Sequence, residues 1–104
     1  MTAVPIQNKM AGYSRWVSRM GADSRMLATH VSLFAAIFVC WQRSGFESPF
    51  PVSRKMLMSY SRISSFATYH KCIRQLDEYG YIRYRPSFDP VGPGSLVWLP
   101  EIST

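Results

Sequence analysis

The sequence predicts a mainly helical α+β domain with an additional helix at its N-terminus. Apolar residues recur at helical spacing as far as Tyr79, and strict apolar–polar alternation replaces that spacing after Gly80. The length of 104 residues suits one domain, and the 47% apolar content is sufficient for a hydrophobic core. We divide the chain into an N-terminal tail with a short amphipathic packing or dimerisation helix (1–24) and a main domain (25–104).

The first helix is expected between Lys9 and Met20, because four apolar residues fall at i, i+3, i+4 and i+7: Tyr13, Trp16, Val17 and Met20. Gly21 is expected to end it, since glycine tolerates the left-handed cap. Asp23 or Ser24 is then expected to cap the next helix.

The second helix is expected from about Arg25 to Arg43, and it is apolar on nearly every side. A helix of this kind is buried on several sides. The core of so small a domain can hardly cover all of those sides. We therefore expect a homodimer. Its predicted interface consists of Trp16, Met20, Leu33, Ile37 and Trp41.

Ser44–Pro51 is expected to be a loop, followed by a short edge strand that includes Phe50 and Val52. Ser53 is expected to cap a short helix over 54–60. After a turn at 61–64, Ser64 or Ser65 should cap a helix that runs to Tyr79.

Gly80 marks the end of that helix, and the next segments alternate as strands do. Tyr81–Arg85 and Ser95–Leu99 should form a two-stranded hairpin around a turn rich in proline and glycine. A short helix, a tight turn, a capped helix and a hairpin together predict a winged helix-turn-helix with a C-terminal hairpin wing.

The predicted second helix of this motif has the charge pattern of a helix that faces DNA. Its acidic residues, Asp77 and Glu78, are confined to its C-terminal end, while hydroxyls and cations occupy the rest. The residues expected to contact the DNA groove are Ser64, Ser65, Thr68, Lys71, Arg74 and Gln75. Those expected to contact phosphates, partly from the wing, are Arg54, Lys55, Arg62, Arg83 and Arg85.

The net charge of +6 favours an anionic partner, either nucleic acid or a membrane surface. The most apolar stretch, Val31–Trp41, is too short to cross a bilayer, so we expect no membrane insertion. The predicted partner is double-stranded DNA, and the expected location is the cytoplasm, where Cys40 and Cys72 would remain reduced core thiols.

Four segments of the sequence resemble small winged-helix transcriptional regulators of Bacteroidetes, which are often associated with mobile or conjugative elements. They are Thr29–Leu33, Thr68–Ile73, Gly80–Ile82 and Gly94–Val97, and the resemblance covers about residues 25–99. It implies a winged-helix fold and DNA binding, and it implies no catalytic residues. The segment Ser87–Gly94 departs from the family, because Asp89 and extra proline and glycine replace the polar or basic wing tip expected there.

The sequence does not predict an enzyme, a metal site or a cofactor. It has no phosphate-binding loop, nucleophile elbow or zinc-ligand spacing, and His70 and Cys72 fall on opposite sides of their helix. His30 is expected to be structural. Two other functions remain open: a winged-helix module that binds protein, and a replication or excision accessory factor of a mobile element. The DNA target, the direction of regulation and any small-molecule effector are left undetermined.

Overall fold

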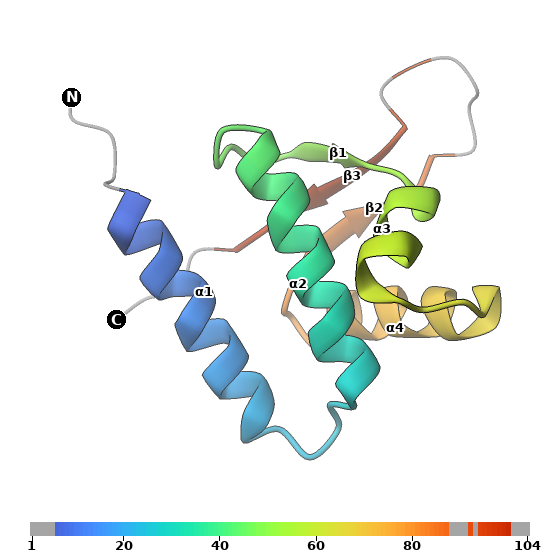
Figure 1. Ribbon diagram of the computed structural model, residues 1–104, viewed down its shortest axis with the longest axis horizontal. Coiled ribbons are helices and arrows are strands. Elements are labelled where there is room, and N and C mark those ends of the chain that lie inside the picture. Colours follow the sequence, from blue (N-terminus) through green and yellow to red (C-terminus); the bar gives the residue numbers. More distant parts are fainter. Residues whose placement is uncertain (1–5, 88–91, 93, 101–104) are drawn as a thin grey trace.

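Figure 1 shows the computed structural model, which describes residues 6–87, 92 and 94–100, with side chains from residue 11 onward. This part of the chain is a small, mainly helical α+β domain with four helices and a three-stranded antiparallel sheet, and it confirms the fold class at that level. In chain order, the elements are α1 (Ile6–Gly21), α2 (Ala28–Arg43), β1 (Phe50–Val52), α3 (Arg54–Ser61), α4 (Phe66–Glu78), β2 (Arg83–Arg85) and β3 (Ser95–Trp98).

The sheet has the strand order β1-β3-β2, so β3 is its central strand. The expected antiparallel pairing of β2 with β3 is present, but it is part of a three-stranded sheet, because β1 pairs with the other edge of β3. Phe50 and Val52 are buried while Pro51 between them is exposed. Since alternate residues of a strand face opposite sides, this pattern holds β1 in the sheet with its apolar side toward the core.

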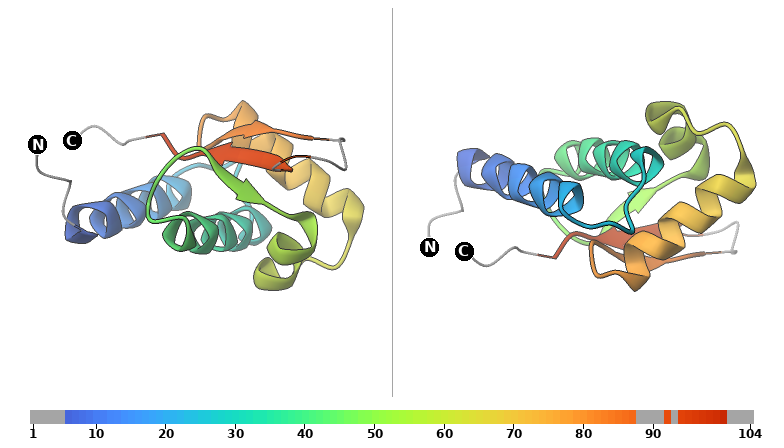
Figure 2. Two further views of the ribbon diagram at one scale, coloured as in Figure 1. Left: turned by 90° about the horizontal axis from the view of Figure 1, so that it is seen from above. Right: turned by 90° about the horizontal axis from the view of Figure 1, so that it is seen from below.

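Helix α2 is the centre of the hydrophobic core. It contacts α1, α3, α4 and β1, and Figure 2 shows it surrounded by these elements. Leu33 and Ile37 on α2 are completely buried, as are Leu57 of α3 and Leu76 of α4. The nearly all-round apolar character of α2 is thus explained by contacts within the single chain.

The residues expected at a dimer interface lie mostly inside this core. Trp16 and Met20 of α1 are buried, as are Leu33 and Ile37 of α2, and only Trp41 keeps partial exposure. Within the chain, α1 contributes Trp16 and Met20 to the core around α2, and α3, α4 and β1 cover other sides of this helix.

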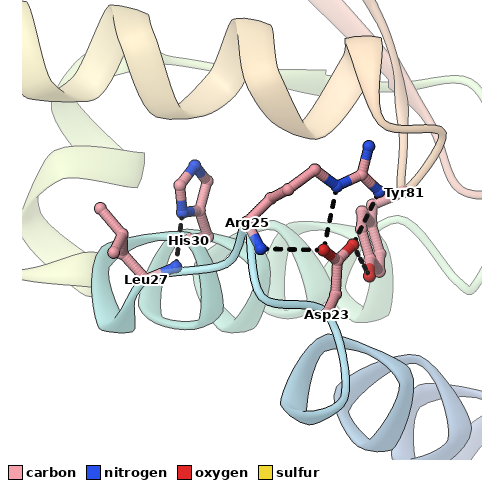
Figure 3. A network of polar contacts seen from close by, with 5 residues as sticks. All are labelled: Asp23, Arg25, Leu27, His30 and Tyr81. Carbon is pink, nitrogen blue, oxygen red and sulfur yellow. Dashed lines mark hydrogen bonds and ion pairs between the residues drawn. The ribbon is translucent and has the colours of Figure 1, made fainter.

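The start of α2 differs from the expectation that Asp23 or Ser24 would cap it. The helix begins at Ala28, with Leu27 as its N-cap residue. Asp23 instead accepts hydrogen bonds from Arg25 and from the Tyr81 hydroxyl, the latter at 2.9 Å (Figure 3). The guanidinium of Arg25 also lies 4.0 Å from the centre of the Tyr79 ring. These contacts tie the α1–α2 linker to the chain just after α4.

His30 takes over the capping role and connects α2 to α4. Its Nδ1 accepts the Leu27 backbone N–H at 2.9 Å (Figure 3). Because Nδ1 is the acceptor, the ring proton is on Nε2, which donates to Oε1 of Gln75 at 2.7 Å. His30 is 1% exposed, so both ring nitrogens are satisfied inside the protein.

Replacing His30 with alanine is expected to lower the free energy of unfolding by about 2–4 kcal/mol, because it removes buried volume and both hydrogen bonds. The matched control is His70→Ala on the exposed side of α4, which should change it by less than about 0.5 kcal/mol. Urea unfolding followed by circular dichroism measures both. Equal losses in the two variants would contradict the structural role of His30.

Asp23 makes stability depend on pH. Hydrogen bonds from the side chain and backbone of Arg25 lower the pKa of Asp23 from its ordinary value of 3.8. The pKa of Asp23 is lower in the folded than in the unfolded protein. The ionised carboxylate therefore stabilises the fold fully at pH values well above the unfolded-state pKa, and this stabilisation is lost as the pH falls toward the folded-state pKa. Asp23→Asn should therefore be less stable than the parent at about pH 7, with the difference narrowing at about pH 3. Urea midpoints at both pH values test this, and a constant difference would contradict it.

Candidate nucleic-acid interface

Serine side chains cap the N-termini of both α3 and α4. Ser53 accepts the Met56 N–H at 3.1 Å and starts α3, as expected. Ser65 accepts the Thr68 N–H at 3.2 Å, so of the two candidate serines it is Ser65 that caps α4. Ser64 is exposed and its side chain has no hydrogen bond to another described residue. Its hydroxyl is therefore available to a ligand, while that of Ser65 is partly used by the helix.

The residues expected on the DNA-facing side of α4 fall into two groups. Lys71 and Arg74 are exposed, and Arg74 Nε lies 3.8 Å from Oε1 of Glu78 in the next turn. Thr68 and Gln75 are half-buried on the side of α4 that faces α2. Oε1 of Gln75 is hydrogen-bonded to His30, so this side chain has a role inside the fold, and its contact with DNA stays a prediction.

An open groove of about 340 Å³ lies between the start of α2 and the α3–α4 turn. Two of its hydroxyls are already engaged: Ser32 donates to the Ser61 carbonyl, and Thr29 accepts the Cys72 thiol at 3.4 Å. Hydroxyl-bearing residues and one arginine dominate the lining, which consists of Ala28, Thr29, Ser32, Ser61, Arg62, Ile63, Ser64, Ser65 and Thr68. The groove therefore offers several hydroxyls and one guanidinium alongside the carbon atoms of its lining.

Three of the predicted phosphate contacts, Arg54, Lys55 and Arg62, lie at the two ends of α3. All three side chains are exposed, and none forms an ion pair with a carboxylate among the described residues. Arg62 has φ +63°, in the left-handed region where a non-glycine residue costs about 1–2 kcal/mol. The turn thus carries a cation at a position where glycine would be less strained.

Arg83 and Arg85 form a second basic group, carried by β2 at the edge of the sheet. Both are exposed, and Tyr84 between them packs against the core, so the two arginines lie on the outer face. The Arg83 guanidinium lies 5.5 Å from the Trp98 ring centre. Most of the predicted wing tip, residues 88–91 and 93, is outside the described residues.

Phe66 is an exposed residue that the sequence analysis did not single out. It is the first residue of α4 and is 60% exposed, with the Arg54 guanidinium 4.6 Å from its ring centre. The sequence pattern did indicate that Phe66 is not on the inward-facing side of α4, because it falls outside the apolar stripe formed by Tyr69, Cys72, Ile73 and Leu76. The exposure itself could be read only from the folded chain.

The two cysteines and Tyr69 are buried. Burial raises the pKa of the Cys40 thiol, and the same cause, desolvation, raises the pKa of Tyr69. Both groups are therefore neutral near neutral pH and act in packing. Within the described residues, no three or more histidine, cysteine or acidic side chains cluster as metal ligands.

The capping assignment can be tested by changing the two adjacent serines separately. Ser65→Ala should lower the free energy of unfolding by about 1 kcal/mol, because the Thr68 N–H loses its acceptor. Ser64→Ala is the matched control and should change it by less than about 0.5 kcal/mol. Thermal or urea unfolding measures both, and a larger loss for Ser64→Ala would reverse the assignment.

The described helices include none with the length and apolar character needed to cross a membrane. Comparison of the chain with models of known protein families, with curated proteins and with solved structures found no match.

Proposed function

We propose that the chain is a winged helix-turn-helix protein that binds double-stranded DNA sequence-specifically through α4, in the control of transcription. The observation that carries the proposal is the polarity of α4. Its N-terminal half carries Thr68 and Lys71 and follows the exposed serines Ser64 and Ser65 of the α3–α4 turn, while Asp77 and Glu78 lie at the other end. A recognition helix presents its N-terminal part to the bases, where phosphates on both sides favour positive charge.

The arrangement of the elements supports the same proposal. Helices α3 and α4, joined by a short turn, are followed by the antiparallel strands β2 and β3. In Figure 1, the α3–α4 turn lies on the side of α2 away from α1. Helix α3 begins with Arg54 and Lys55, Arg62 follows its end, and Lys71 lies on α4.

The strained position of Arg62 is a further support. A left-handed φ at a non-glycine residue is retained when the surrounding structure or the function compensates for its cost. In this proposal Arg62, beside the groove at the start of α4, binds a backbone phosphate. Arg83 and Arg85 bind phosphates farther along the duplex, while Lys71 and Ser64 approach base edges.

The other two interpretations have less support. The protein-docking hypothesis was based on apolar surface around Trp16 and α2, and those side chains are buried in the chain's own core. Four of the five residues predicted at a dimer interface are buried in the same core, so we propose DNA binding by the single chain. A replication or excision accessory factor would use the same DNA-binding surface and would differ only in its biological context.

The proposal is tested by fluorescence anisotropy of a labelled random-sequence duplex titrated with the protein at several salt concentrations. A protein that contacts three to five phosphates should give a log–log slope of about −3 to −5. Lys71→Ala should weaken binding at least about fivefold, because the cation reaches the groove. Absence of binding at low salt would contradict the proposal and would favour protein docking.

The matched control for Lys71→Ala is Arg15→Ala. Arg15 is an exposed cation on α1, on the opposite side of α2 from the α3–α4 turn (Figure 1). Both variants remove one positive charge, so a general electrostatic effect would weaken binding equally. We expect Arg15→Ala to change the dissociation constant by less than about twofold, since exposed charges are screened over distances beyond about 10 Å.

A further inference from the structure

Phe66 is unusual among the phenylalanines of this structure. Phe34, Phe38 and Phe50 are buried, whereas Phe66 is 60% exposed at the first residue of α4. Most of its surface is open to solvent, although the Arg54 guanidinium lies against the ring. Its position at the start of the proposed recognition helix suggests that a ligand covers it.

The surroundings of Phe66 indicate the chemistry of that ligand. Its ring faces the Arg54 guanidinium at 4.6 Å, and the exposed residues that follow Phe66 on α4 include Lys71 and Arg74. The other large exposed apolar residues, Leu27 and Tyr60, belong to the start of α2 and to α3. Phe66 is therefore an exposed ring beside a guanidinium, on the helix that carries Lys71 and Arg74, which suits a partner that is anionic but carries small apolar groups.

Duplex DNA has this combination in its major groove. Each thymine presents a 5-methyl group there, next to phosphates that attract cations, and phenylalanine is one of the side chains that contact this methyl. The N-terminal residues of a recognition helix are those that approach the base edges. Phe66 and Ala67, the first two residues of α4, are both exposed and apolar.

We propose that Phe66 makes this protein prefer sites with a thymine at one position, by packing its ring against the thymine 5-methyl group. This inference rests on the proposed function, because α4 must enter the major groove for the contact to form. Arg54 holds the ring from the side of α3 and binds a phosphate beside the same base. Specificity for thymine thus comes from an apolar contact, while affinity comes mainly from the surrounding cations.

The test uses the difference between thymine and uracil, which is only the 5-methyl group. A random duplex library is selected with the protein, and the preferred site is then synthesised with each thymine replaced in turn by uracil. At one position uracil should weaken binding about fourfold, the effect of losing one buried methyl-sized group. Phe66→Ala should bind the thymine and uracil versions of that site equally.

The matched control is Tyr60→Ala, which removes another exposed aromatic ring paired with an arginine, Arg43 at 5.4 Å. This variant should keep the parent's thymine-to-uracil ratio even if its overall affinity changes. Circular dichroism checks that both variants fold, which we expect because both rings are exposed.

The outcomes separate the two proposals. Tight duplex binding with no effect of uracil, or the same uracil effect in Phe66→Ala as in the parent, overturns the role of Phe66 and leaves DNA binding intact. The role of Phe66 is also overturned if the selection enriches no particular site and the protein binds random duplexes that contain thymine or uracil with equal affinity. Failure to bind any duplex at low salt overturns the proposed function itself.

Discussion

The burial of α2 is the interaction on which the rest of the structure depends. Leu33 and Ile37 are covered completely, and the covering side chains come from elements as far apart in the chain as Met20 and Leu76. Removing apolar surface from water is the main driving force of folding, and α1, α3, α4 and β1 all pack against this one helix, while β2 and β3 join the fold through α4 and β1. The exposed turn between α3 and α4 is a consequence, because both helices direct their apolar faces toward α2.

Polar contacts then fix the orientation of the elements that hydrophobic burial brings together. Asp23 joins the α1–α2 linker to Tyr81, and His30 joins the start of α2 to Gln75 on α4. Such contacts are directional, whereas apolar burial is not. The hydrogen bond between His30 and Gln75 therefore helps to fix which side of α4 faces α2.

The candidate interface combines features that do not favour stability with features that suit a polyanionic ligand. Arg62 occupies a left-handed conformation, Phe66 exposes an aromatic ring, and the cations around α3 lack carboxylate partners among the described residues. Departures from local rules that cluster on one surface are expected at functional sites. The buried side of the molecule, by contrast, leaves no described buried side-chain polar atom without a hydrogen-bond partner.

The sequence alone determined the order and type of most elements, because spacing and capping are local. Ser53 and the glycine after α4 marked helix ends, and the alternation after Gly80 indicated strands. The tertiary structure decided the side-chain contacts and strand pairings that join residues far apart in the chain. Asp23 accepts a hydrogen bond from Tyr81 instead of capping α2, and Gln75 faces inward to His30. Strand β1 pairs with β3, and α1 covers apolar surface that had suggested a second chain. Each depends on a contact between residues far apart in the chain, which periodicity and local propensity cannot reveal.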